Sequence, residues 1–234
     1  MSDLRIALVA EGPTDRIVIE AALKAIVPCP FVLSILQPEA TRPEMGNGWG
    51  GVLKWCHATS LRHQGSLDVD PTLAGFDLLI LHVDADVADM QYLDCGQQAA
   101  DMAHQFGWQV LPCSMPCPPS VNTCVQLQTT LSSWLRNATP GQKTIFCIPS
   151  KSVGVWLAAA VLPPEHFLLT DAECNLVLEN QLAQLPLNQR IRKSKRDFMK
   201  HDGTITSNWA QVTAICSQAL AFQQSIQQIA TSAY

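Results

Sequence analysis

Apolar runs and amphipathic stretches alternate along the first two thirds of this chain. Short aliphatic runs bounded by turn residues predict strands at 4–10, 31–36, 76–83, 108–111 and 143–148. Apolar positions at helical spacing predict helices at 17–27, 52–63, 92–106, 121–136 and 152–161. The run at 76–83 has almost no polar alternation, which is typical of a parallel strand covered on both faces. The pattern predicts an α/β fold with a Rossmann-like parallel sheet and helices on both faces.

The strand pattern stops near residue 163, and helices and basic loops follow. We therefore divide the chain into an α/β domain, 1–162, and a helical, partly basic extension packed on it, 163–234. The last predicted helix, about 208–230, carries apolar residues at spacings of three and four. This apolar stripe is expected to pack on its own domain, and the alternative is a homodimer interface.

Composition narrows the class of protein. A chain of 234 residues with 47% hydrophobic content fits one folded domain plus an extension. The charged share is 15%, below the usual level of about 25%, which argues against a disordered chain and against a generic basic nucleic-acid binder. The longest apolar run is 153–162, far short of the roughly 20 residues that a membrane span needs. We expect a cytoplasmic protein with no membrane partner.

The nine cysteines are expected to be reduced and to serve mainly as small buried apolar residues. The one cluster is Cys113, Cys117 and Cys124. It has no close Cys-x-x-Cys pair and no fourth ligand nearby, so a structural zinc site is disfavoured.

Acidic residues follow two of the predicted strands at the point where each strand ends. Glu11 comes directly after the first strand, and Asp84 and Asp86 come directly after the strand at 76–83. Ligands of open parallel sheets bind outside the carboxyl ends of the strands, so these carboxylates are expected to converge. Mg²⁺ prefers few protein carboxylates, several waters and substrate phosphate oxygens. The pattern predicts a Mg²⁺–phosphate site, although an aspartate after a strand is often only a helix cap.

Two segments resemble a known domain family. The segments 5–15 (RIALVAEGPTD) and 79–86 (LILHVDAD) are similar to the motifs of the TOPRIM domain, which is shared by topoisomerases, DnaG-type primases and nucleases of the OLD (overcoming lysogenization defect) family. The resemblance covers roughly the first half of the chain and looks most like stand-alone bacterial OLD-like proteins. It implies Glu11 as an acid–base and metal residue, and Asp84 and Asp86 as ligands of Mg²⁺ or Mn²⁺. It also implies hydrolysis of DNA or RNA phosphodiesters, and many such relatives look like phage-defence components.

Other branches of the family fit less well. A topoisomerase needs a nucleophilic tyrosine and large gate domains, and this chain has two tyrosines and no room for such domains. A primase of this type carries a zinc module ahead of the TOPRIM motifs, whereas Glu11 lies close to the start of this sequence. OLD proteins carry an ATPase with a phosphate-binding GxxxxGK[ST] motif, which is absent here. Any partner ATPase is therefore expected to be a separate chain.

One departure concerns the second metal position. The segment 147–157 (CIPSKSVGVWL) resembles a strand-to-helix segment that in these relatives often carries a glutamate just before a Trp-Leu pair. Gly154 stands at the matching place, so the second metal position is either missing or filled from elsewhere, with Asp15 and Asp89 as candidates. Lys151 is a candidate catalytic residue that neutralises a phosphate. Its alternative role is a solvated helix start.

A basic segment, residues 190–200, stands out in a chain whose net charge is −5. A charge run is usually a solvated surface, but neutralising phosphates drives sequence-independent binding to nucleic acid. Lys193, Lys195 and Arg196 are expected to contribute most, and Lys195 is the candidate for the lysine that the resemblance implies near the metals. The candidate nucleic-acid-binding residues are Arg190, Arg192, Lys193, Lys195, Arg196 and Lys200.

Two further features have a structural and a functional interpretation. His82 lies two residues before Asp84 and is expected to be a buried, hydrogen-bonded core histidine. The glycine-rich stretch 46–51 follows no strand, so it fails the dinucleotide-binding pattern and is expected to be a flexible loop near the site, such as a lid.

Two rival functions remain open. A phosphatase of the haloacid dehalogenase type has a similar strand before its Asp-x-Asp motif, but Ala88 stands where that family has Thr or Val. A catalytically degenerate TOPRIM module that binds nucleic acid or a partner ATPase is favoured by the missing glutamate at Gly154.

Overall fold

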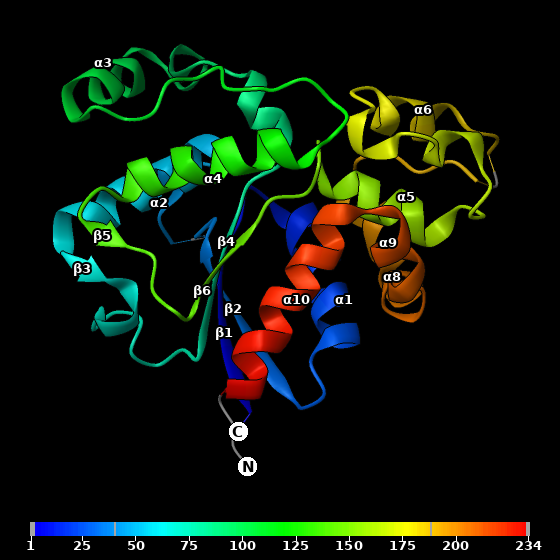
Figure 1. Ribbon diagram of the computed structural model, residues 1–234, viewed down its shortest axis with the longest axis horizontal. Coiled ribbons are helices and arrows are strands. Elements are labelled where there is room, and N and C mark those ends of the chain that lie inside the picture. The colour runs from blue at the N-terminus through cyan, green and yellow to red at the C-terminus, as the bar shows by residue number, and fades with distance from the viewer. Residues whose placement is uncertain (1–2, 40, 188, 233–234) are drawn as a thin grey trace.

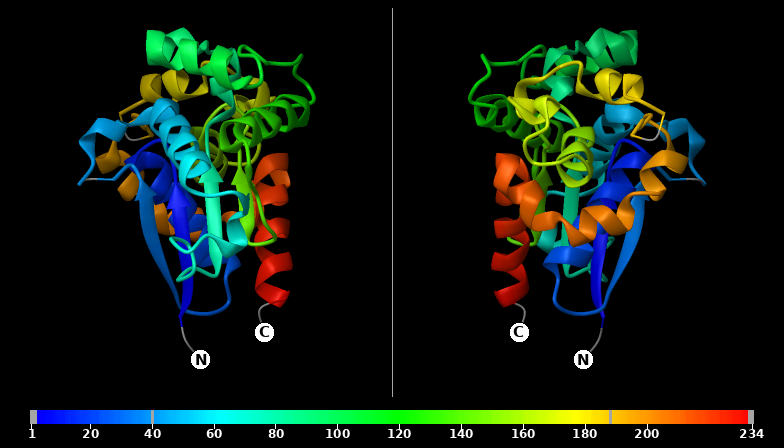
Figure 2. Two further views of the ribbon diagram at one scale, coloured as in Figure 1. Left: turned by 90° about the vertical axis from the view of Figure 1, so that its left-hand side faces the viewer. Right: turned by 90° about the vertical axis from the view of Figure 1, so that its right-hand side faces the viewer.

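Four parallel strands form the centre of the protein (Figure 1). The computed structural model describes residues 3–39, 41–187 and 189–232. The strands are β1 (Leu4–Val9), β2 (Phe31–Gln37), β4 (Leu78–His82) and β6 (Thr144–Cys147), in the order β2-β1-β4-β6. Figure 2 shows them side by side in this order. The predicted α/β class with a parallel sheet is confirmed.

Helices cover both faces of the sheet because successive side chains of a strand point to opposite faces. Ile6 and Leu8 of β1 pack into a core with α1 (Pro13–Ile26), α5 (Val153–Val161) and α10 (Ser217–Ser232). Ala7 and Val9 point the other way, into a second core with α2 (Gly48–Arg62) and α4 (Val121–Leu135). A further helix, α3 (Gln97–Phe106), contributes its buried Ala103 to this second core.

The starts of two helices follow from local sequence. Pro13 occupies the first turn of α1, where its missing N–H costs nothing and its fixed φ suits a helix. The Ser152 side chain accepts a hydrogen bond from Gly154 N and so caps α5. Across the described ranges, no helix combines the length and the apolar character needed to cross a membrane.

The last third of the chain consists of short helices that extend the first core. They are α6 (Leu178–Gln184), α7 (Lys195–Met199), α8 (Asp202–Ser207) and α9 (Trp209–Ile215), followed by α10. The Trp156 ring of α5 lies 5.5 Å from the Trp209 ring and 5.7 Å from the Phe222 ring, centroid to centroid.

The single helix expected at 208–230 is two helices, α9 and α10, because the chain leaves the helical conformation at Cys216. Its apolar stripe is used inside the protein: Val212, Ala219, Phe222 and Ile226 are buried. The stripe therefore packs on its own domain, as expected, and a homodimer through this helix stays a prediction.

Three local predictions differ from the structure. Residues 108–111 form no strand; Trp108 and Leu111 are buried, but Val110 between them is 74% exposed. The stretch 46–51 is not a loop throughout, because Gly48 begins α2. The helix predicted at 92–106 is a short 3₁₀ turn, Tyr92–Cys95, followed by α3. The two are separated at Gly96, whose φ of 98° favours glycine. A two-residue pair between β3 (Gly65–Ser66) and β5 (Ala138–Thr139) was not predicted.

The cysteines are not all reduced. Cys117, in the loop before α4, forms a disulfide with Cys174, in the short 3₁₀ turn Ala172–Cys174, and the other seven cysteines are free thiols. Cys117 is therefore not available as a thiolate ligand to a metal. The sequence could not show this pairing, because 57 positions separate the two cysteines.

Candidate active site

Carboxylates gather at the carboxyl ends of β1 and β4, the two central strands. Glu11 lies two residues beyond β1, and Asp84 lies two residues beyond β4. The Glu11 Oε1 atom accepts a hydrogen bond of 2.8 Å from the backbone N–H of Asp84. The structure thus brings together two acids that are 73 positions apart in the sequence, at the edge where α/β folds bind ligands.

His82 lies between two of these acids. Its side chain is fully buried, with Nε2 3.3 Å from Asp84 Oδ1 and Nδ1 3.9 Å from Asp15 Oδ2. Neither ring nitrogen makes a contact of hydrogen-bond geometry within the described residues. Burial opposes a charged ring, but the Asp84 contact and the surrounding carboxylates prevail and raise the pKa of His82 to about 9. The expected core histidine is buried, but it serves as a counter-charge to the acids rather than as a hydrogen-bonded core residue.

Burial, together with neighbouring negative charge, raises the pKa values of Glu11, Asp15 and Asp86. Burial, followed by the charge of Asp84, raises the pKa of Glu11 to about 8. The same two causes raise the pKa of Asp86 to about 7. Burial also raises the pKa of Asp15, whose Oδ2 accepts a hydrogen bond of 2.7 Å from Gly12 N. Carboxyl groups that hold protons near neutral pH are common at functional sites.

The loop between β6 and α5 holds the Asp-x-Asp motif in place. The backbone N–H of Val153 donates a hydrogen bond of 3.0 Å to Asp84 Oδ1, and the backbone N–H of Asp86 donates one of 3.0 Å to the Lys151 carbonyl. Lys151 has a φ of 65°, a conformation that non-glycine residues adopt at a cost and that concentrates at functional sites. Its Nζ lies 3.7 Å from Asp89 Oδ2, so both predicted residues lie at this edge of the sheet.

A carboxylate from another element lies beside Gly154. Glu179, on α6, packs so closely on Gly154 that a Cβ added there would lie 2.6 Å from Glu179 Oε1. Ser152 Oγ donates a hydrogen bond of 2.7 Å to that same oxygen. Sequence reasoning missed Glu179, and no local signal could have found it, because it lies 25 positions further along the chain in a segment with no recognisable motif.

The basic segment divides into two parts. Lys193 Nζ lies 2.9 Å from Glu179 Oε2. Burial disfavours its charge, but the Glu179 contact prevails and raises the pKa of Lys193, so the ammonium group stays charged beside the acids. Lys195, the candidate catalytic lysine, instead lines an open hollow together with Arg196, Met199 and Lys200.

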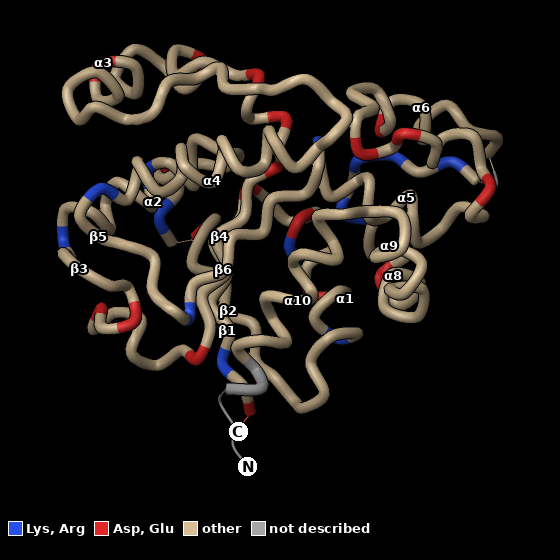
Figure 3. The backbone as a smooth tube through the Cα atoms, in the orientation of Figure 1, with Lys and Arg blue, Asp and Glu red and all other residues tan. Residues whose placement is uncertain are grey.

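The remaining basic residues make local contacts within the extension. The Arg190 Nε donates to the Leu185 carbonyl, and the Arg192 backbone N–H donates to an oxygen of Asp197. Lys200 Nζ forms an ion pair of 2.8 Å with Asp197. Figure 3 shows basic and acidic stretches of the chain side by side around α6.

A small cavity of about 90 Å³ lies beside the acids. Its wall combines side chains from the Asp-x-Asp turn, the start of α5 and the α6 region, among them Asp86, Lys151, Ser152, Asn175, Glu179 and Asn180. The backbone N–H of Gly48, at the start of α2, donates a hydrogen bond of 2.8 Å to the Glu11 carbonyl. The glycine-rich stretch therefore borders the site as the first turn of a helix, and the prediction of a flexible lid is wrong.

Within residues 3–39, 41–187 and 189–232, no three His, Cys, Asp or Glu side chains converge in the arrangement of a ready-made metal site. Comparison of the chain with protein-family models, with curated proteins and with solved structures finds no match. The function is therefore argued below from the residues and their geometry.

Proposed function

We propose that this protein is a Mg²⁺- or Mn²⁺-dependent nuclease that hydrolyses phosphodiesters of DNA or RNA at Glu11, Asp84 and Asp86. The observation that carries the proposal is the convergence of Glu11 and Asp84 at one sheet edge. The charged Lys193 pairs with Glu179 nearby and interacts electrostatically with Asp84 and Asp86. The direct test is incubation of the purified protein with plasmid and with single-stranded DNA, in Mg²⁺, in Mn²⁺ or in EDTA.

The acids suit a hard divalent cation. Mg²⁺ requires only one or two protein carboxylates, since waters and substrate phosphate oxygens complete its shell. Glu11, Asp84 and Asp86 would hold it. Burial, and after it the charge of Asp84, raises the pKa of Glu11 and of Asp86, and a bound cation would offset both effects. When bound, such a cation polarises the scissile phosphate and favours deprotonation of a water.

The chain's own residues have separate roles in this proposal. Lys193 and Lys151 supply positive charge for non-bridging phosphate oxygens, as preorganised cations do in phosphoryl transfer. Before a cation binds, Glu11 has a pKa of about 8 and can exchange a proton near neutral pH, and a bound cation would displace that proton. The Ser152 and Val153 contacts fix the orientation of Glu179 and Asp84 before substrate arrives.

The pH dependence of metal binding provides one test. Glu11 and Asp86 have folded pKa values of about 8 and about 7, above their ordinary values of 4.5 and 3.8, so they lower the stability of the metal-free fold as pH rises through that range. The raised pKa of His82 stabilises the fold at low pH, and this contribution is lost as pH rises from 6.5 through about 9. A divalent cation replaces the protons. Saturating MgCl₂ should therefore raise Tm little at about pH 5.5 and by several degrees at about pH 8.5, measured by calorimetry. An equal rise at both pH values would show that Mg²⁺ binds elsewhere.

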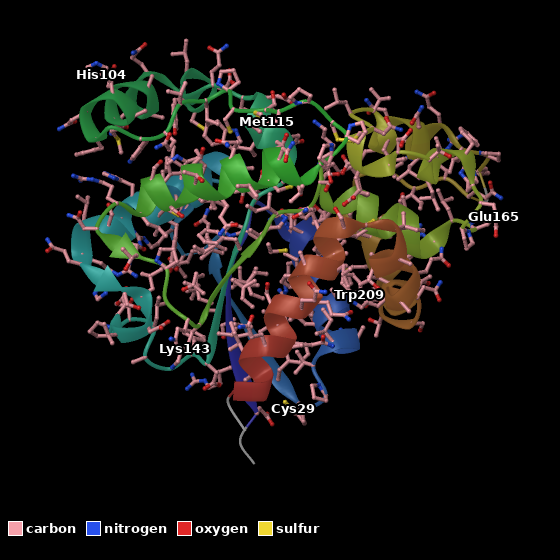
Figure 4. All side chains as sticks on the ribbon, in the orientation of Figure 1. Cys29, His104, Met115, Lys143, Glu165 and Trp209 are labelled. Carbon is pink, nitrogen blue, oxygen red and sulfur yellow. A yellow bond between two sulfur atoms is a disulfide. The ribbon has the colours of Figure 1, made fainter. Side chains whose placement is uncertain are left out.

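Binding of nucleic acid provides a second test. Lys195 and Arg196 line the open hollow, away from Glu179, so they are available to backbone phosphates. The double variant Lys195→Gln/Arg196→Gln should weaken DNA or RNA binding and lower its salt slope by roughly 0.7–0.9 per lost contact. The matched control is Lys143→Gln, an exposed lysine before β6 at the other end of the molecule (Figure 4). Unchanged affinity and slope in the double variant would leave those two residues as solvated surface.

A second candidate function rests on the positive side chains that already lie beside the acids. His82 and Lys193 already neutralise part of the acidic cluster, as expected for a module that binds nucleic acid or a separate ATPase chain without cutting. Such a module would retain DNA or RNA binding with no Mg²⁺-dependent cleavage.

We place either activity in the cytoplasm, where a stable disulfide is unusual and a transient one usually senses redox state.

A further inference from the structure

A covalent bridge links the two walls of the cavity at the candidate site. One wall is the Asp-x-Asp turn: the Ala88 carbonyl, two residues beyond Asp86, accepts hydrogen bonds from Cys113 N at 2.8 Å and Ser114 N at 3.1 Å. The loop that supplies these donors continues to Cys117, three residues further along the chain. Cys117 is bonded to Cys174, which lies five residues before Glu179 on the other wall.

Glu173 reinforces the same junction without covalent bonds. Its carboxylate accepts hydrogen bonds from Ser150 Oγ at 2.8 Å, Ser120 Oγ at 3.3 Å and Gln218 N at 3.2 Å. The segment before Glu179 therefore has a polar anchor and a covalent anchor at adjacent residues. The polar anchor survives reduction of the disulfide, so reduction is expected to loosen this segment without unfolding the protein.

The bridge is within reach of small reagents. Cys117 and Cys174 are both partly exposed, and the neighbouring Pro116 and Pro118 are exposed. Figure 4 shows the sulfur–sulfur bond between the loop before α4 and the segment before α6. A dithiol can therefore attack it.

We propose that Cys117–Cys174 is a redox latch that holds Glu179 and Asp86 at working distance. A thiolate of the dithiol attacks one sulfur and releases the other cysteine as a thiol. The second thiolate of the dithiol then displaces the remaining cysteine. The dithiol is oxidised to its cyclic disulfide, and two electrons and two protons pass to Cys117 and Cys174. The reduced protein has a loosened cavity, and the oxidised protein is the competent form.

Two measurements on the intact protein test the latch itself. Alkylation under denaturing conditions, followed by mass spectrometry, should count seven thiols before dithiothreitol and nine after it. Hydrogen exchange should then speed up by about tenfold or more in peptides covering 112–117 and 171–184, because local opening controls amide exchange. Nine thiols in protein prepared without reductant, or identical exchange in both states, would overturn the proposal.

Variants separate the latch from general effects of reductant. Cys174→Ser should show the fast exchange without dithiothreitol and no further change with it. Cys29→Ser should respond to dithiothreitol as the parent does, since Cys29 lies at the far end of the molecule from α6 (Figure 4). A Cys174→Ser variant that still responds to reductant would assign the effect to other thiols.

A third measurement rests on the proposed nuclease function. Reduction should slow Mg²⁺-dependent plasmid cleavage by about tenfold or more, because small displacements of catalytic groups carry large rate penalties. Equal cleavage in both states would refute control of the site by the latch. If neither state cuts, the proposed function fails, and the thiol count and hydrogen exchange still decide the latch.

Discussion

Asp84→Asn should reduce cleavage by on the order of a thousandfold, the usual cost of losing a central electrostatic group. Asp84 adjoins Glu11 through its backbone and His82 through its side chain, so it lies at the centre of the acidic cluster. Asparagine keeps the shape and an oxygen acceptor for Val153 N, so the fold should survive while the negative charge is lost. The measurement is the initial rate of plasmid cleavage in Mg²⁺, with circular dichroism and Tm confirming an intact fold.

The matched control is Asp101→Asn, an exposed aspartate on α3 that contacts Gln97. It removes the same charge far from the sheet edge and should leave the cleavage rate within about twofold, because exposed charges contribute little. A cleavage rate that Asp84→Asn leaves unchanged would exclude this carboxylate cluster as the catalytic centre.

Trp156→Ala should lower the free energy of unfolding by about 3–5 kcal/mol, the usual cost of removing a large buried aromatic side chain. The indole ring is fully buried on α5 and packs against Trp209 and Phe222, which belong to the last third of the chain. Truncation therefore leaves a cavity where the extension meets the first core. Urea unfolding followed by both fluorescence and circular dichroism would measure the loss.

Leu187→Ala is the control for this substitution, because Leu187 is 83% exposed and should change stability by less than about 0.5 kcal/mol. A loss below about 1 kcal/mol in Trp156→Ala would mean that the two parts of the chain are held together elsewhere.

The strands and the acids at their ends could be predicted because both depend on local sequence. An uninterrupted apolar run such as residues 78–81 of β4 has few alternatives to a buried parallel strand, and the chain direction then decides where Glu11 and Asp84 emerge. The strand predicted at 108–111 is absent because tertiary packing, and not local sequence, decides the conformation of this segment. Trp108 and Leu111 fill gaps in the second core, and that tertiary packing requires no strand.

The residues missed at the site come from long-range packing. Glu179 and the Cys117–Cys174 pair are brought toward this edge of the sheet by the fold of the extension, and no period or motif in the sequence records that fold. The basic segment could be recognised by composition, but composition could not distinguish Lys193, which contacts Glu179, from Lys195, which lines an open hollow.

The order in which the site residues occur along the chain has a consequence for synthesis. Glu11 follows the first strand, whereas Glu179 and Lys193 lie in the last quarter of the 234 residues. Protein domains generally fold as units, and the first core includes buried residues of α9 and α10. The acidic edge and Lys193 therefore come together only after nearly the whole chain has been made. A growing chain, or one that terminates early, therefore lacks the cation beside the acids. An enzyme that cuts nucleic acid would in this way remain inactive beside the messenger RNA from which it is being made.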